Sequence, residues 1–379
     1  MVRIGIVGIG SMGTNYLNWF KEGKIKDAAV TAVCDISPER ITWARENLPN
    51  VTVFEDYKAL AKSGLIDAIM VVTPHYLHPA IAIEGMKNGL HVLVEKPAGV
   101  YTKQIQEMND YASKHPELKF SMMFNQRTNP LYQKLKSLIE NKEIGDIRKI
   151  TWIITSWWRT QKYYDSSPWR ATWWGEGGGI LVNQAPHQLD LWQWIFGLPK
   201  TVRGYLQYGS HRDITVEDDV TAFLQYENGA MGTLITCTHD AIGSDRLEIQ
   251  GNKGKIIIED SSKITIKRMF ESEDELNKKL DFRQMLALMR GETGDKLYSE
   301  ETFDIPEKWG FQHIDVLNNF ISAIESGEKL LAPGSEGIKA VRLANAIHLS
   351  SWLNTEVEIP FDEDLYYEQL QKKIAEEKK

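Results

Sequence analysis

The sequence VRIGIVGIGSMG, residues 2–13, decides the fold of the first half of this chain. Its apolar start at residues 2–7 predicts a strand, and a helical pattern follows at residues 14–21. Between them lies G-x-G-x-x-G, which in a strand–turn–helix context is typical of dinucleotide-binding folds. The glycines allow a tight turn, close approach of a pyrophosphate and close packing of helix on strand, and the helix amino terminus offers amides to phosphates. The alternative is a glycine-rich turn without a ligand. We expect the cofactor to contact Gly8, Ile9, Gly10, Ser11, Met12 and Gly13.

Strand and helix patterns alternate from this motif to about residue 125. Further strands are expected at residues 30–34, 51–54, 68–72, 90–94 and 120–123, and helices at 38–47, 79–88 and 102–114. Such alternation predicts βαβ units and a parallel sheet. We therefore expect an α/β protein in which residues 1–124 form a Rossmann domain with a doubly wound parallel sheet.

The pattern changes in the second half of the chain. Helices are expected at residues 131–141, 186–196, 312–326 and 337–354, and strands at 148–156, 221–226, 230–238, 246–250 and 255–259. Consecutive strands without intervening helices predict an antiparallel sheet. Residues 268–310 are polar and predict an irregular excursion over one face, and residues 364–379 predict a surface helix or a frayed tail. Residues 125–379 are expected to form a substrate-binding and oligomerisation α/β domain.

Composition excludes several classes of protein. The net charge of the 379 residues is −8, without the basic patch of a nucleic-acid-binding protein. The two cysteines, Cys34 and Cys237, form no CxxC pair, which argues against a disulfide framework or a zinc site. No apolar run has the length of a membrane span, and the amino terminus reads as a strand rather than a signal peptide. We expect a cytoplasmic protein that binds neither nucleic acid nor membrane.

Asp35 ends the second predicted strand, 22 residues past Gly13. A carboxylate at this point hydrogen-bonds the ribose 2′-hydroxyl and repels a 2′-phosphate, which favours NAD over NADP. Arg40 is a competing signal, because a nearby arginine accepts a phosphate, so NADP stays open. The alternative role for Asp35 is an N-cap of the helix at residues 38–47.

Two further loops follow predicted strands at the edge where such sheets bind ligands. Thr73 and Pro74 follow the strand at residues 68–72, and His78 either joins them at the cofactor or only starts a helix. Glu95 and Lys96 follow the apolar run at residues 90–94. An ammonium there would meet both the cofactor and a reacting substrate oxygen; the alternative is a solvated lysine. Glu95 either orients the lysine or contacts the cofactor.

These motifs resemble those of the Gfo/Idh/MocA (glucose–fructose oxidoreductase, inositol dehydrogenase) family. The matching positions are residues 8–13, Asp35, Thr73, Pro74, His78, residues 95–97, 125–127 and 177–181, His187, Asp190 and the stretch from 332 to 352. The resemblance implies a Rossmann domain followed by an α/β domain with an open, mostly antiparallel sheet, which often serves as an oligomer interface. It also implies a homodimer or homotetramer, NAD(P)-dependent oxidation of sugars or cyclitols, and Gln126 at the cofactor.

Oxidation of an alcohol needs a hydride acceptor, a base and a group that stabilises the developing alkoxide. NAD supplies the acceptor. His187 is the candidate base, because an imidazole with a pKa of about 6.5 exchanges protons near neutrality. Lys96 is expected to hydrogen-bond the same substrate oxygen, and the resemblance implies the same two roles. The alternative for His187 is a buried core histidine.

Asn183 departs from the family pattern, in which many members carry an aspartate four residues before the histidine. Asparagine binds a substrate hydroxyl but accepts no proton, so a carboxylate relay through this position is excluded and an inositol dehydrogenase is less favoured. Asp190, one helical turn past His187, either orients the imidazole or is solvated. The pair lacks a third ligand, so we expect no metal there.

Aromatic residues crowd the segment before the triple glycine at residues 177–179; eight of twelve tryptophans fall in residues 152–194. Aromatic faces cover the C–H surfaces of sugars, and guanidinium groups donate to their hydroxyls. Tyr163, Trp169, Arg170 and Trp173 are therefore candidate substrate residues beside Lys96, Asn183 and His187. Trp152, Trp192 and Trp194 are expected in the core. The triple glycine is expected to let backbone approach the cofactor or substrate, and His313 to start a helix.

The leading hypothesis is an NAD(P)-dependent dehydrogenase acting on a ring hydroxyl of a sugar, glycoside or cyclitol, with the sugar C3 hydroxyl as the specific position. One alternative is an NAD-dependent glycosidase that oxidises its substrate transiently. Another is a non-enzymatic dinucleotide-binding sensor, against which the presence of both Lys96 and His187 argues.

Overall fold

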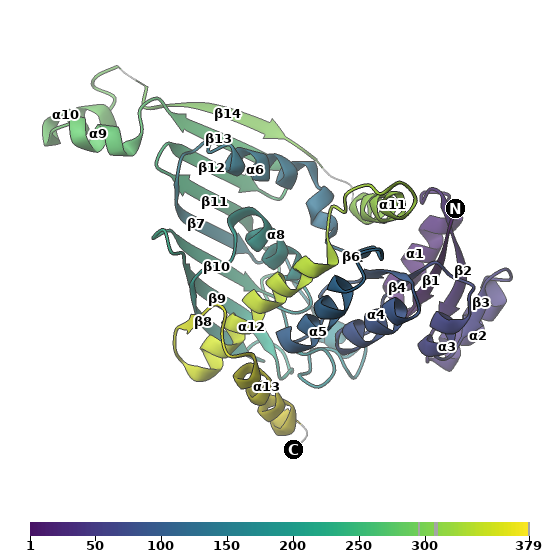
Figure 1. The fold of residues 1–379 in the computed structure, drawn as a ribbon. Helices are drawn as coiled ribbons and strands as arrows, with labels where there is room; N and C mark the ends of the chain where they lie inside the picture. The colour runs from purple at the N-terminus through teal and green to yellow at the C-terminus, as the bar shows by residue number, and fades with distance from the viewer. Residues whose placement is uncertain (295, 307–309, 378–379) are drawn as a thin grey trace.

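The computed structural model describes residues 1–294, 296–306 and 310–377, and within them it contains two sheets (Figure 1). The first has six strands in the order β3-β2-β1-β4-β5-β6, all parallel. Its strands are β1 Val2–Val7, β2 Ala28–Cys34, β3 Thr52–Phe54, β4 Ala68–Val71, β5 His91–Val94 and β6 Phe120–Met122. This is the doubly wound order of a dinucleotide-binding domain, and the predicted Rossmann sheet is confirmed.

The helices of this half are α1 Ser11–Lys21, α2 Pro38–Asn47, α3 Tyr57–Lys62, α4 His78–Lys87 and α5 Thr102–Ser113. Helix α1 begins three residues earlier than predicted, directly after Gly10, so the last residues of the glycine motif form its first turn. Helix α3 was not predicted; the Asp56 side chain caps it by accepting from the Lys58 amide.

The second sheet has nine strands in the order β14-β13-β12-β11-β7-β10-β9-β8-β15. They are β7 Ile147–Ile154, β8 Thr201–Tyr208, β9 Glu217–Gln225, β10 Met231–Cys237, β11 Asp245–Gly251, β12 Gly254–Glu259, β13 Lys263–Met269, β14 Tyr298–Asp304 and β15 Val357–Glu358. Strands β7 and β10 pair in parallel, and all other neighbouring strands of this sheet pair antiparallel. The predicted mostly antiparallel sheet is therefore confirmed.

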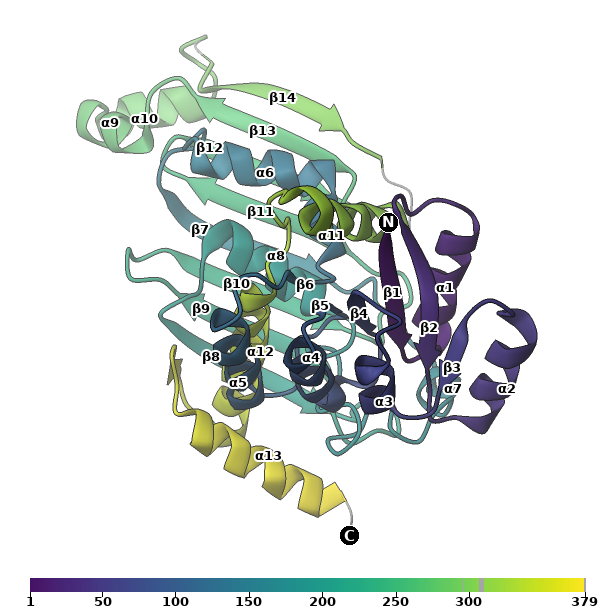
Figure 2. The ribbon, with the colours of Figure 1, turned by 45° about the vertical axis from the view of Figure 1, so that its right-hand side comes forward.

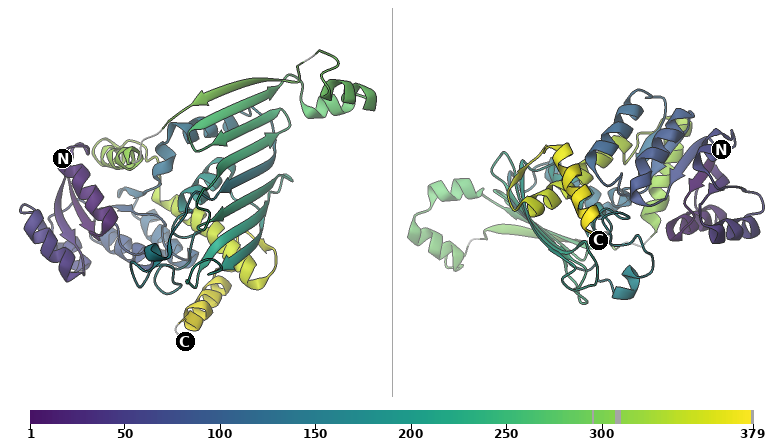
Figure 3. Two further views of the ribbon diagram at one scale, coloured as in Figure 1. Left: turned by 180° about the vertical axis from the view of Figure 1, so that it is seen from behind. Right: turned by 90° about the horizontal axis from the view of Figure 1, so that it is seen from below.

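One face of this sheet is covered by helices and the other is largely uncovered (Figure 3). The helices of this half are α6 Pro130–Glu140, α7 Gln161–Tyr164, α8 Pro186–Phe196, α9 Glu273–Lys279, α10 Phe282–Met289, α11 Phe311–Ser326, α12 Gly337–Leu353 and α13 Glu363–Glu377. Along β9, Val220, Ala222 and Leu224 are buried beneath the helices, whereas Phe223 is 41% exposed on the opposite face. This alternation is that of a sheet with one solvated side.

The predicted irregular excursion at residues 268–310 is wrong for the part that the structure describes. It contains α9, α10 and the edge strand β14, which pairs with β13. Strand β14 gives no alternating apolar signal because most of its side chains are exposed. Cross-strand ion pairs such as Lys267–Glu300 and Arg268–Glu301 accompany the backbone pairing. Residues 295 and 307–309 lie outside the described residues.

The carboxyl-terminal segment forms helix α13 rather than a frayed tail, because Tyr366 and Leu370 are fully buried. Residues 378–379 of the predicted segment lie outside the described ranges. Across those ranges, none of the helices combines the length and the apolar character needed to span a bilayer.

Two helices from the second half hold the halves together. Helix α11 lies beside β1 (Figures 1 and 2), and its Leu317 and Phe320 share a core with Ile4 and Tyr16. The Asn345 side chain of α12 donates to the Val100 carbonyl at 3.0 Å and accepts from the Thr102 amide at 3.3 Å.

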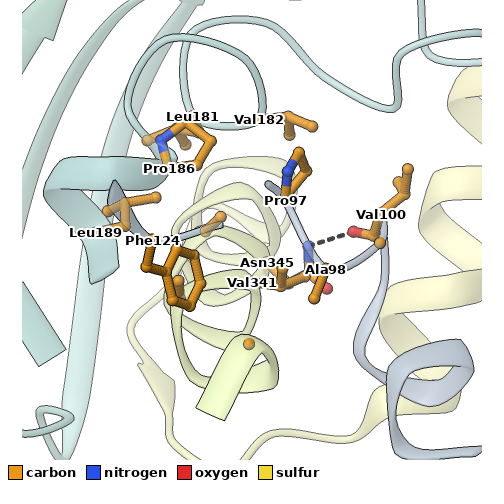
Figure 4. Close-up of a pocket in the computed structure, with 14 residues that line it drawn as sticks. Pro97, Ala98, Val100, Phe124, Leu181, Val182, Pro186, Leu189, Val341 and Asn345 are labelled. Carbon is orange, nitrogen blue, oxygen red and sulfur yellow. Dashed lines mark hydrogen bonds between the residues drawn. The ribbon is translucent and has the colours of Figure 1, made fainter. Parts of the chain in front are cut away.

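The loop after β5 is packed against helices of the second half (Figure 4). Pro97 and Ala98 meet Leu181, Pro186 and Val341 around an apolar void of about 10 Å³. This void is too small for a ligand, so the contact is a packed joint. It fixes the loop that carries Lys96 relative to the start of α8.

Candidate active site

The glycine loop has the geometry that a dinucleotide requires. Gly8 has a φ of +94°, and a Cβ there would lie 2.4 Å from the Val72 carbonyl oxygen. A Cβ on Gly13 would lie 2.1 Å from the Gly8 oxygen, whereas one on Gly10 would meet no heavy atom within 4 Å. Gly8 and Gly13 therefore serve the turn and the packing of the helix, and Gly10 leaves open space where a pyrophosphate approaches.

A cleft of about 540 Å³ opens over this loop. The predicted cofactor residues that line it are Gly8, Gly10, Ser11, Met12, Asp35, Thr73 and Pro74. The Asp35 carboxylate accepts from the Ile9 amide at 2.8 Å and the Ser37 amide at 2.9 Å. The Thr73 hydroxyl is buried and has no hydrogen-bond partner among the described residues, so it offers a polar atom to a ligand. These residues fit NAD, whose nicotinamide supplies a hydride acceptor when it is bound.

Replacing Gly10 with alanine is expected to weaken NADH binding without unfolding the protein. The added methyl group enters the open side of the loop, and the steric overlap with a pyrophosphate costs about 1–3 kcal/mol, or roughly 10- to 100-fold in Kd. Fluorescence titration with NADH measures this. Gly8→Ala is the contrasting variant and should instead lower Tm, because its Cβ meets backbone. Wild-type NADH affinity in Gly10→Ala would contradict the placement of the cofactor.

Seven of the predicted cofactor residues do not line the cleft: Ile9, Gly13, Arg40, His78, Glu95, Lys96 and Gln126. The ring nitrogens of His78 face the Pro97 carbonyl at 2.7 Å and the Thr73 carbonyl at 2.6 Å, so the side chain ties two loops together. The Gln126 side chain accepts from Asn129 at 3.4 Å. Arg40 lies in the first turn of α2 and is not among the residues that border the cleft.

Lys96 follows β5, and its ammonium donates to the Asn183 carbonyl at 3.0 Å. Its own amide donates to the Glu95 carboxylate at 3.0 Å, and the Tyr16 hydroxyl donates to the same carboxylate. The Lys96–Pro97 bond is cis. Burial lowers the pKa of Lys96, and the carboxylates of Glu95 and Glu176 oppose that effect. Glu95 is buried and bonded to protein, so it holds the lysine loop and does not line the cleft.

His187 lies in the first turn of α8, directly after Pro186 of the packed joint. Its Nδ1 is buried and has no hydrogen-bond partner among the described residues. Burial holds its pKa well below the ordinary value, and the charge of Lys96 and the nearby His313 lower it further. The imidazole is therefore neutral near pH 7, which is the form that accepts a proton.

Both predicted roles for Asp190 are wrong. Its carboxylate is fully buried and accepts two hydrogen bonds from the Arg127 guanidinium, at 2.8 and 2.7 Å. Arg127 also pairs with Glu336, which precedes α12. Asp190 thus anchors α8 to the segment at residues 125–128 instead of orienting His187.

His313 begins α11, as predicted, and it also reaches the edge of the site. Its ring is 5.6 Å from that of Trp19, and its Nδ1 lies 3.2 Å from the Asn125 amide nitrogen. Burial lowers the pKa of His313 to about 4, with a contribution from the charge of Lys96. It is a neutral side chain between the two halves.

Three of the predicted substrate residues belong to one polar cluster with Lys96. The Arg170 guanidinium donates to the Tyr163 hydroxyl at 2.7 Å and lies 4.4 Å from the centre of its ring. The Asn183 amide is 3.3 Å from the same hydroxyl. Trp169 and Arg170 also line the cleft over the glycine loop, so this cluster borders the cleft that fits NAD.

Trp173 is not in this cluster. It is buried against His348 and Trp352, and its indole donates to the Thr215 carbonyl at 3.1 Å. Its polar atom finds a protein partner, and its ring packs under the second sheet. Trp152 and Trp192 stack in the core with ring centres 6.4 Å apart, as predicted, whereas Trp194 is half-buried.

The triple glycine packs against protein, not against the cleft. A Cβ on Gly177 would lie 2.3 Å from the Val100 side chain, and one on Gly179 would lie 2.0 Å from the Glu217 carbonyl oxygen. This backbone was expected to approach the cofactor or substrate closely. Instead it packs closely against Val100 and Glu217 of neighbouring segments.

Glu176 is the site residue that the sequence reasoning missed. It is buried, and its carboxylate accepts from the Ala171 amide at 2.6 Å and from the Asn183 side chain. Burial raises its pKa to about 7, and Arg170 and Lys96 act against this shift. A signal was present: the acid directly precedes the triple glycine and lies seven residues before Asn183. Asn183 was expected to leave the site without a carboxylate, but the Glu176 carboxylate lies beside it.

Two family profiles match the chain. The Gfo/Idh/MocA profile described as the oxidoreductase family's NAD-binding Rossmann fold matches residues 2–123. The profile described as its carboxyl-terminal alpha/beta domain matches residues 136–359.

Similar proteins agree with the profiles. Myo-inositol 2-dehydrogenase of Thermotoga maritima is 25% identical over 352 residues, covering 91% of this chain and 95% of the relative. Levoglucosan dehydrogenase of Pseudarthrobacter phenanthrenivorans is 24% identical and covers 86% of this chain and 89% of the relative. The structure of the WlbA dehydrogenase from Chromobacterium violaceum with NADH and UDP-GlcNAcA superposes with a TM-score of 0.77 at 26% identity, over 95% of this chain and 96% of that one.

The second profile alone spans more than half of the chain, and the first coincides with the sheet and glycine loop that form the nucleotide cleft. The chain therefore belongs to the Gfo/Idh/MocA oxidoreductase family and is an NAD-dependent enzyme of that family.

Proposed function

We propose that this enzyme oxidises a ring hydroxyl of a sugar, glycoside or cyclitol, with Lys96 and His187 at the reacting oxygen. One observation carries the proposal: the Lys96 ammonium is near enough to the unpartnered imidazole of His187 for its charge to lower the His187 pKa, beside a cleft that fits NAD. The names of the relatives, which include inositol and levoglucosan dehydrogenases, support this substrate class.

NAD⁺, when bound in the cleft, would supply the acceptor for the hydride that leaves the substrate carbon. The neutral imidazole of His187 takes the hydroxyl proton, so the C–H and O–H bonds break and a carbonyl forms. The ammonium of Lys96 donates a hydrogen bond to the same oxygen and stabilises its developing negative charge. Tyr163 and Arg170 offer an aromatic face and donors to the rest of the ring.

Glu176 is proposed as a positioning residue. Its carboxylate holds the Asn183 side chain, and the Asn183 carbonyl receives the Lys96 ammonium. When Glu176 ionises, its carboxylate accepts the hydrogen bond from the Asn183 side chain more strongly, and so holds Asn183 and the Lys96 ammonium bonded to its backbone carbonyl more firmly. Because the pKa of Glu176 is about 7, activity is expected to rise with pH through this value.

Glu176→Gln should lower kcat/KM about 10- to 100-fold, as expected when a reacting group is misplaced. It should also remove the rise in kcat/KM near pH 7, because the amide does not titrate. A pH profile of kcat/KM measures both effects, and Glu22→Gln, at an exposed acid, is the matched control. If the rise near pH 7 persists in Glu176→Gln, the assignment to Glu176 is wrong.

The substrate class is tested by incubating the enzyme and NAD⁺ with a panel of hexoses, glycosides, nucleotide sugars and inositols. NADH absorbance is the readout, and we expect at least one member to give sustained NADH formation. We propose the C3 hydroxyl of a sugar as the oxidised position, which NMR analysis of the product would identify. Release of an aglycone without accumulation of NADH would instead indicate transient oxidation.

A further inference from the structure

We propose that His211, Asp219 and His239 form a binding site for a divalent transition-metal ion such as zinc. Asp219 lies in β9 of the second sheet and the two histidines lie in the segments after β8 and β10, and none of the three lines the nucleotide cleft. This site could not be predicted from the sequence, because the three residues are separated along the chain and match no metal-binding spacing.

The topology of the sheet brings the three residues together. Strand β9 lies between β8 and β10, and the register places Asp219 opposite Gln207 of β8 and Cys237 of β10. His211 follows the end of β8 and His239 follows the end of β10. Because β9 is antiparallel to both neighbours, its start adjoins their two ends.

The distances are those of a site close to its bound geometry. The Nε2 of His239 is 3.0 Å from the Asp219 carboxylate, and the two imidazole ring centres are 4.0 Å apart. Candidate ligand atoms of all three residues lie within 4.8 Å of one another. Tetrahedral zinc, with bonds of about 2.0–2.1 Å, needs ligand atoms about 3.4 Å apart, so small side-chain rotations suffice.

A buried carboxylate fixes the backbone around these residues. The Asp218 side chain is fully buried and accepts from the His211 amide at 2.9 Å. The Asp218 carbonyl accepts from the Thr238 amide at 3.0 Å. Asp218, which precedes Asp219, therefore anchors both the loop that carries His211 and Thr238, the residue before His239. The three side chains are therefore presented by a rigid frame, as metal sites require.

Asp219 supplies the negative charge of the site. The ion pair that Asp219 makes is with His239, which is not a permanent cation. The nearest arginine in sequence to His211, Arg212, donates to the carbonyls of Arg159 at 2.8 Å and His211 at 2.5 Å. The hydrogen bond to Asp219 accounts for the position of the His239 ring. It does not account for the His211 ring, whose centre lies 4.0 Å from that of His239.

Two imidazoles and one carboxylate are ligands that suit zinc and its neighbours in the transition series. Three protein ligands leave at least one coordination position, which water or an added anion would occupy. His211 is exposed, and the side chains of Asp219 and His239 are 29% and 27% exposed, so an ion has direct access.

The test is calorimetric titration of the full-length, untagged, chelator-treated protein with Zn²⁺. We expect one high-affinity equivalent per chain. His239→Ala and Asp219→Asn should each weaken Zn²⁺ binding by about tenfold or more. Titration with Co²⁺ should give visible d–d absorption in the wild type and lose it in both variants. Circular dichroism and NADH binding verify that the variants are folded.

His115→Ala is the matched control, because His115 makes a similar exposed pair with Glu117 at 3.2 Å but has no second imidazole in that pair. It should bind Zn²⁺ like the wild type. Absence of a high-affinity equivalent in the wild type would overturn the proposal. So would equal binding by the wild type, His239→Ala and Asp219→Asn, since the ion would then be held elsewhere.

Discussion

Replacing Lys96 with alanine is expected to lower kcat about 10²- to 10³-fold, which is the usual cost of losing one preorganised donor to a developing oxyanion. NADH affinity should change little, because the residues that cradle the dinucleotide are those of the glycine loop and the loops after β2 and β4. Steady-state kinetics with the substrate found in the panel, together with NADH titration, separates the two effects.

The control for this variant is Lys103→Ala, which removes an exposed lysine paired with Asp364 on the surface. It should have wild-type kinetics, since exposed ion pairs contribute little. A Lys96→Ala enzyme that keeps its kcat, or that loses turnover only because it no longer binds NADH, would show that the ammonium does not act on the substrate oxygen.

Replacing His187 with alanine is expected to lower kcat/KM about 10²- to 10⁴-fold, the range attributed to general acid–base catalysis. The imidazole is neutral at neutral pH because burial and the charge of Lys96 lower its pKa. The wild type is therefore expected to show no loss of activity from His187 protonation between pH 6 and 8. The pH profile and the single-turnover rate of hydride transfer measure these effects.

His187→Gln refines this experiment, because glutamine keeps polar atoms in the site but accepts no proton at neutral pH. Both variants should be slow, and external imidazole should partly restore His187→Ala by occupying the vacated space. Equal activity of His187→Gln and the wild type would mean that His187 only binds the substrate and that the base lies elsewhere.

The Rossmann half could be predicted nearly element by element from the sequence. Its strands are buried apolar runs separated by helices, and the glycine pattern marks the one turn where a Cβ would strike backbone. Lys96 could be placed because a strand end in such a sheet faces the ligand. These are local signals, and they suffice to predict a parallel, doubly wound sheet.

The remainder depends on contacts between distant segments. Asp190 pairs with Arg127, which lies 63 residues away, so helical spacing from His187 alone gave two wrong roles. Trp173 is buried by α12, which no local pattern around it indicates. Glu176 was missed because its link to Asn183 depends on the fold of an irregular segment. Strand β14 was missed because its side chains carry no alternation.

The central claim is that a ring C–H of a carbohydrate or cyclitol delivers its hydride to the nicotinamide in a step that needs Lys96 and His187. The direct measurement uses the substrate identified in the panel, deuterated at the carbon that bears the reacting hydroxyl, and analyses the NADH by mass spectrometry. We predict deuterium in the NADH, a slower transfer step than with the protiated substrate, and loss of turnover in Lys96→Ala and His187→Ala. Unlabelled NADH, or no NADH from any member of the panel although the enzyme binds NADH, would contradict the account.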